Sequence, residues 1–136
     1  MSHRITVSFS AGRVSADPNP SPGLGSRVMP GETVTWSFDE TRELQVVFNQ
    51  IVDLDEEGRV IEATRRAVNP MGPLNALSLG RGLIVGTIRS DVPQGATNRR
   101  FLYRLIEDGA ALPWTDRVEG GDETNGGGID IPRTPP

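Results

Sequence analysis

Two short runs between residues 29 and 49 alternate apolar and polar side chains, and this alternation constrains the fold more than any other feature. The first run, TVTWSF at residues 33–38, places valine, tryptophan and phenylalanine at every second position. The second, LQVVF at residues 44–48, repeats the pattern with leucine, valine and phenylalanine. A side-chain period of two is typical of a β-strand with one buried face, and Pro30-Gly31 supplies a turn just before the first run. The stretch therefore predicts two β-strands joined by a short polar connection.

The rest of the chain repeats this pattern in short segments separated by turns. Sixteen glycines and eleven prolines in 136 residues leave few helix-favouring runs, which is typical of a single all-β domain. Further strands are predicted at residues 5–9, 83–88 and 101–107, the last partly buried on both faces. Residues 51–62 are expected to form a hairpin around an acidic turn.

Four less regular segments also receive an interpretation. Residues 13–16 are expected to continue the first strand after a bend at residues 11–12. Residues 62–68 have room for at most one short helix, since Pro70 would end it. Residues 77–79 and 111–114 are expected to form short strands.

The alternating stretch also resembles a known family. Residues 30–36, PGETVTW, resemble the PGDTVTW strand of cupredoxins, which are small copper-binding β-sandwiches. A weaker resemblance continues through Phe101, Tyr103 and the glycine-rich segment 126–132. The resemblance implies a Greek-key β-sandwich of about seven or eight strands over residues 1–132, followed by a proline-rich tail at 133–136.

The copper ligands of that family are absent from this chain. In cupredoxins a histidine ligand heads a run similar to HNVVF, and Leu44 occupies that position here. The other family ligands are a cysteine and a second histidine, whereas this chain has no cysteine and only His3, which we expect at a disordered terminus. A blue-copper site needs a thiolate and imidazoles. We therefore expect no metal, no cofactor and no electron transfer.

Charge and composition restrict the remaining functions. The formal net charge of −4 disfavours binding to nucleic acid or to anionic membranes. No apolar run is long enough for a signal peptide or a membrane span, so a cytoplasmic location is expected. All 14 basic residues are arginine, which reflects either coding composition or a surface suited to carboxylate contacts. We favour coding composition, because no clustering of arginines is visible along the chain.

The inventory of reactive side chains predicts that the protein is not an enzyme. There is no cysteine or lysine, and the serines have no recognisable base. Asp53, Asp55 and Glu57 precede Gly58 as in the start of a calcium loop, but Thr64 stands where the bidentate glutamate is required. A solvated hairpin turn is therefore favoured there over a calcium site.

The remaining candidates for binding lie near the C-terminal end. Trp114 follows Pro113 and is either an exposed aromatic anchor or a lid over the core, the lid being slightly favoured. A glycine-rich loop at residues 116–128 is expected to be solvated and flexible, which is favoured over the alternative that it binds a cation or an arginine-rich partner surface. Its acidic residues are Asp116, Glu119, Asp122 and Glu123.

The leading functional hypothesis is a non-catalytic interaction module, an accessory or subunit that binds another protein. Two alternatives stay open. One is a domain that binds a small ligand, a carbohydrate or a cation through Trp114 and the acidic loop. The other is a structural or decoration component of a larger particle, for which a symmetric assembly would be the signature.

Overall fold

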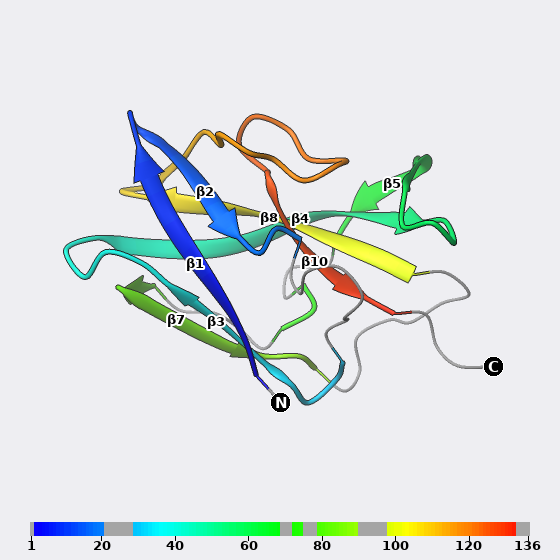
Figure 1. Ribbon diagram of the computed structural model, residues 1–136, viewed down its shortest axis with the longest axis horizontal. Coiled ribbons are helices and arrows are strands. Elements are labelled where there is room, and N and C mark those ends of the chain that lie inside the picture. The colour runs from blue at the N-terminus through cyan, green and yellow to red at the C-terminus, as the bar shows by residue number, and fades with distance from the viewer. Residues whose placement is uncertain (1, 21–28, 69–71, 75–78, 90–97, 133–136) are drawn as a thin grey trace.

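The computed structural model describes residues 2–20, 29–68, 72–74, 79–89 and 98–132, and these residues form β-strands and no helix (Figure 1). The all-β prediction is therefore confirmed. The described residues therefore contain no helix with the length and apolar character needed to cross a membrane. The strands are β1 (Ser2–Ser10), β2 (Arg13–Asp17), β3 (Thr33–Ser37), β4 (Glu43–Leu54), β5 (Val60–Ala67), β6 (Gly80–Arg81), β7 (Leu83–Thr87), β8 (Asn98–Glu107), β9 (Ala110–Ala111) and β10 (Gly127–Ile131).

The strands are arranged in two sheets. Sheet I has the order β2-β1-β3-β7, with β1 parallel to β3 and the other pairs antiparallel. Sheet II has the order β10-β8-β4-β5, with β6 added to β4 and β9 added to β8. The two predicted strands of the central stretch therefore belong to different sheets. Strands such as β2, β3 and β7 bury every second residue, and the two sheets pack these apolar faces against each other.

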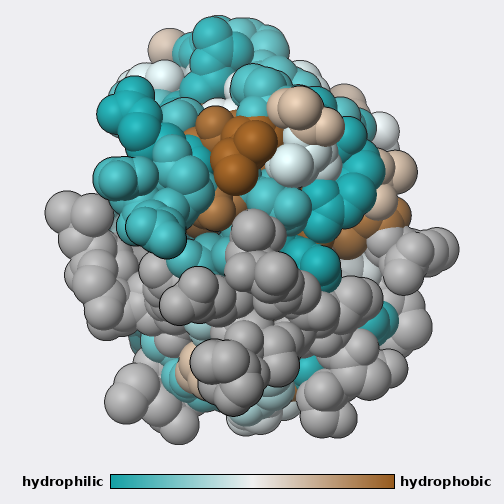
Figure 2. All heavy atoms as spheres, turned by 90° about the vertical axis from the view of Figure 1, so that its right-hand side faces the viewer, coloured by the Kyte–Doolittle hydropathy of each residue, from teal (hydrophilic) through white to brown (hydrophobic). Residues whose placement is uncertain are grey.

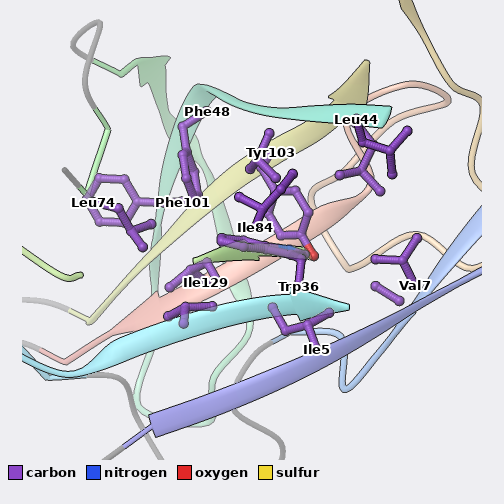
Figure 3. Packing of buried hydrophobic residues seen from close by; sticks show 14 of the residues in the cluster. Ile5, Val7, Trp36, Leu44, Phe48, Leu74, Ile84, Phe101, Tyr103 and Ile129 are labelled. Atoms are coloured by element: carbon purple, nitrogen blue, oxygen red, sulfur yellow. The ribbon is translucent and has the colours of Figure 1, made fainter. Parts of the chain in front are cut away.

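An aromatic cluster lies at the centre of the core between the sheets (Figure 3). The Tyr103 ring of β8 makes edge contacts with Trp36 of sheet I at 5.5 Å and with Phe48 and Trp114 at 5.7 Å between centroids. Such edge-to-face pairs add roughly 0.5–1.5 kcal/mol each beyond their burial. Gly127 of β10 packs directly on this cluster, because any Cβ atom there would overlap the Tyr103 ring.

The Tyr103 hydroxyl is buried with its ring, and within the described residues it has no hydrogen-bond partner of normal geometry. Burial raises the pKa of this hydroxyl far above its ordinary value, because the phenolate would lose its hydration. The nearby Trp36 side chain opposes that increase only in part.

Several predicted strands are confirmed, and the bounds of others change. Phe101, Leu102 and Tyr103 are all buried, so β8 is covered on both faces as expected. The hairpin at residues 51–62 exists, and its turn is held by Asp55, whose carboxylate accepts the backbone N–H groups of Glu57 at 2.9 Å and Arg59 at 2.8 Å.

Two local interpretations are wrong. Ala11 and Gly12 do not bend one continuous strand but make a tight turn, with φ values of 52° and 78°, that folds β2 back antiparallel on β1. The segment with room for a helix belongs instead to β5, because pairing with β4 overrides the weak helical signal. Of the segment 111–114 only Ala111 belongs to a strand, the two-residue β9, and Trp114 makes a single bridge to Val14. Residues 77–78 and the tail at 133–136 lie outside the described residues.

Candidate functional site

Trp114 is buried and is not an exposed anchor. Its side chain is 2% exposed and its ring packs on Tyr103 in the core. Its backbone N–H donates to the Glu123 carbonyl at 2.9 Å, which ties the tryptophan to the acidic loop. The aromatic-anchor interpretation is therefore wrong, and Trp114 covers and completes the core.

The acidic loop is folded on the outer face of sheet II, contrary to the expected flexibility. The Val118 N–H donates to the Gly126 carbonyl at 2.9 Å, and the Val118 side chain is only 6% exposed. Arg100 of β8, itself buried, donates to both carboxylate oxygens of Asp130 and to the Glu119 carbonyl. Composition predicts mobility for such a loop, but these contacts hold it in place.

The four acidic side chains of the loop do not converge on a common point. Glu119 accepts the Val60 N–H at 3.2 Å, and Glu123 pairs with Arg13 at 2.8 Å. Asp122 accepts backbone N–H groups of its own turn, and Asp116 is exposed to solvent. Across the described ranges, no three histidine, cysteine, aspartate or glutamate side chains come together as a metal ligand set. The loop therefore presents no assembled cation site in the described structure.

Leu44 and His3 occupy well-defined places. Leu44 is fully buried at the start of β4, beside Gly80 of β6. His3 lies within β1, and its Nε2 atom is 2.5 Å from the Glu32 carboxylate. The expectation that His3 sits at a disordered terminus is wrong, because β1 pairs with β3 from its first residue onward.

One cavity borders the core beside Ile51 and Phe101, and three arginines line it. We call this cavity of about 280 Å³ the arginine pocket. Its floor contains Ile51 and Phe101, which are 5% and 2% exposed. The described residues that line it are Ile51, Arg66, Ala67, Val68, Gly72, Arg89, Arg99 and Phe101.

Strand register builds the arginine pocket. Ile51 of β4 pairs with Phe101 of β8 on one side and with Arg66 of β5 on the other. Arg99 lies on the same face of β8 as Phe101, two residues nearer the strand end. The inner face of sheet II therefore changes from apolar to cationic as it leaves the core. Figure 2 looks at this end of the molecule, where hydrophilic residues surround a small apolar patch in the described part of the surface.

Asp53 is the acidic residue that faces this cluster in the described contacts. Its Oδ1 atom is 3.1 Å from Arg66 Nη2 and 3.7 Å from Arg99 Nε. The first distance is a charge-assisted hydrogen bond, and the second exceeds hydrogen-bond length. A single carboxylate thus serves two guanidinium groups at the edge of the pocket.

The sequence interpretation missed this cluster. It attributed the arginines to coding composition because they are not clustered along the chain, yet Arg66, Arg89 and Arg99 line one cavity. The doublets at residues 65–66 and 99–100 were the available signal. They become informative only once the register places Arg66 and Arg99 on opposite sides of β4.

The arginine pocket includes Arg89, which lies just past the end of β7, and a second hollow lies at the start of that strand. We call it the β7 groove, a depression of about 540 Å³. The backbone lies close together there, since the Phe38 N–H donates to the Gly82 carbonyl at 3.0 Å and the Gly82 N–H to the Arg42 carbonyl at 3.1 Å. The residues that line the groove are Ser37, Phe38, Glu40, Arg81, Gly82 and Leu83.

Large apolar side chains stand exposed beside the β7 groove. Leu83 is 50% exposed and Val85 is 54% exposed, while Ile84 between them is buried in the core. Leu83 and Val85 therefore share the outer face of β7. They form an apolar ridge that continues from the groove along sheet I.

No protein-family model matches this chain, and no curated protein matches it either.

Proposed function

We propose that this chain is a copper-free, cupredoxin-like Greek-key sandwich that acts as a non-catalytic interaction module and binds another protein at the β7 groove. The observation that carries the proposal is the half-exposed pair Leu83 and Val85 beside that groove. In support of the cupredoxin-like relationship, the PGETVTW and LQVVF motifs contribute to β3 and β4, which lie in different sheets.

The apolar ridge is suited to contact with a protein. Side chains two residues apart on one strand face are about 7 Å apart, so Leu83 and Val85 form a continuous apolar ridge. Contiguous exposed apolar surface beside polar residues is typical of protein interaction sites. The groove next to the apolar ridge accepts one projecting apolar side chain of the partner. This side chain would contact Phe38 and Leu83.

Charge favours a different protein over a second copy of this chain. Two copies with a net charge of −4 repel each other. Arg81, whose side chain is 61% exposed, and Glu40 stand at the rim of the groove. We therefore infer a partner that presents an apolar side chain on a neutral or basic surface.

The test compares capture of partners by three immobilised proteins. Wild-type chain, a Leu83→Thr/Val85→Thr double variant and an Ile61→Thr variant are exposed to the same native lysate, and captured proteins are quantified by mass spectrometry. Threonine keeps the β-propensity at all three positions. Ile61 is the control because it is exposed on β5 of the other sheet. The proposal predicts a partner that is lost from the double variant and retained by Ile61→Thr.

The structural-component alternative is tested with purified chain alone. Light scattering measures its mass over a range of concentrations. A homo-oligomer that dissociates on Leu83→Thr/Val85→Thr substitution would make the β7 groove a self-interface and overturn the proposal.

A further inference from the structure

We propose that the arginine pocket is a binding site for a small organic acid, a carboxylate carried on a compact apolar body. This site is separate from the β7 groove and from the acidic loop. It rests on three features: the three guanidinium groups, the apolar floor and the limited volume.

The cationic rim supplies the recognition of the carboxylate. Arg66, Arg89 and Arg99 come from three different parts of the chain and line the same cavity. Among the described lining residues, every charged side chain is arginine. A guanidinium group presents parallel N–H donors that match the two oxygens of a carboxylate. This local chemistry is opposite in sign to the chain as a whole, whose net charge is −4.

The contacts of Asp53 show that the arginines at the edge of the pocket already bind a carboxylate. Its Oδ1 atom lies between Arg66 and Arg99, at 3.1 Å and 3.7 Å. Asp53 of β4 is paired in register with Arg99 of β8, and it is not among the described residues that line the pocket. A ligand carboxylate that enters the pocket would share these guanidinium groups with Asp53.

The floor and the volume determine the rest of the ligand. Ile51 and Phe101 are almost fully buried and present an apolar surface beneath the arginines. A cavity of about 280 Å³ lies just below the usual range for drug-sized ligands, so it suits a small acid. An inorganic anion could contact the arginines but would leave the apolar floor without a contact.

The test measures binding of benzoate, benzamide and inorganic phosphate to the full chain by isothermal titration calorimetry and by NMR. Benzoate combines a carboxylate with a flat apolar ring, benzamide has the same shape without the charge, and phosphate has the charge without the ring. We expect benzoate to bind with a Kd on the order of 1 mM. Benzamide and phosphate are each expected to bind at least tenfold more weakly. Amide signals of Arg99 and Phe101 should shift with benzoate.

Two matched arginine variants locate the site. Arg66→Gln is expected to weaken benzoate binding about tenfold or more, because a hydrogen bond to a charged group is lost. Arg117→Gln removes the same charge from an exposed position in the acidic loop and is expected to leave the Kd unchanged. Thermal unfolding of both variants checks that each remains folded at the titration temperature.

Three outcomes would overturn the proposal. Benzoate that does not bind would exclude an organic-acid site. Phosphate that binds as tightly as benzoate would show that the apolar floor is not used. Equal effects of Arg66→Gln and Arg117→Gln would show that benzoate senses only the overall charge.

Discussion

The two ends of β7 carry hollows of opposite character. The β7 groove lies at the start of the strand and is lined by the half-exposed Leu83. The arginine pocket lies just past the end of the strand and is lined by Arg66, Arg89 and Arg99. The hollows lie at the two ends of the five-residue strand β7, which is about 15 Å long and runs from left to right in Figure 1. The groove lies beside the outer face of sheet I, whereas the pocket is lined by Ile51 and Phe101 from the inner face of sheet II. The comparison teaches that hollows of opposite character can lie at the two ends of one strand, because each is lined by a different face of the sandwich.

The largest expected difference between the two hollows concerns folding stability. Phe101 is both the pocket floor and a core residue, so Phe101→Ala should lower the free energy of unfolding by about 3–5 kcal/mol. Leu83→Ala at the groove should change it by roughly 0.5 kcal/mol or less, because Leu83 is half exposed. Urea unfolding followed by tryptophan fluorescence measures both. Similar losses for the two variants would mean that the ridge is also part of the core.

The stability of the aromatic cluster around Tyr103 should depend on alkaline pH. Since burial raises the pKa of Tyr103 in the folded state, the unfolded chain loses the phenolic proton first. The free energy of unfolding should therefore fall as the pH rises above about 10, by up to about 1.4 kcal/mol per pH unit. Tyr103 is the single tyrosine, and the chain contains no lysine or cysteine, so no other side chain titrates near that pH.

Tyr103→Phe is the control for this pH dependence. The variant should lose the decline above about pH 10 and should differ from wild type by about 1 kcal/mol or less at pH 7, since the hydroxyl makes no normal hydrogen bond. Urea unfolding at a series of pH values measures the slope. A decline that persists in Tyr103→Phe would mean that another group controls alkaline stability.

A smaller effect sharpens the description of the arginine pocket. Asp53→Asn removes the carboxylate that faces Arg66 and Arg99, and should lower stability by about 1 kcal/mol. The same variant should bind benzoate several-fold more tightly, because the ligand no longer shares these arginines with Asp53. Calorimetry and thermal unfolding give the two quantities. Weaker benzoate binding would mean that Asp53 organises the pocket and does not compete with its ligand.

The smallest expected effect is the response of the two sites to salt. Raising sodium chloride from 20 to 500 mM should weaken benzoate binding several-fold, because mobile ions screen the guanidinium charges. Partner capture at the β7 groove should be unchanged or slightly stronger, since apolar contacts dominate there. Titrations with benzoate and quantitative partner capture at both salt concentrations test this difference in salt dependence. An identical salt response at the two sites would contradict the prediction.

The strands were predictable from local sequence because strand formation depends on alternation over a few residues. The runs at 33–38 and 44–48 predict β3 and the start of β4, and residues 83–88 predict β7. The same local reasoning failed at residues 62–68, where pairing with a neighbouring strand decides the outcome. It also failed at Trp114, since proximity to proline and glycine does not reveal which way a side chain faces.

The two candidate sites also differ in how far local sequence predicts them. The exposed side chains Leu83 and Val85 follow from alternation once the buried face is known, so the apolar ridge was within reach of the sequence. The arginine pocket was not, because Arg66, Arg89 and Arg99 are 10 to 33 positions apart in the chain.

Taken alone, the sequence determined an all-β chain without cysteine or lysine, because these properties depend on residue identity and short-range alternation. Only the tertiary structure decided that Trp114 faces the core, that the acidic side chains diverge and that three arginines line one cavity. The physical reason is strand register. A shift of a single residue between β4 and its neighbours would turn Arg66 and Arg99 to the opposite face of the sheet, and no local pattern specifies that alignment.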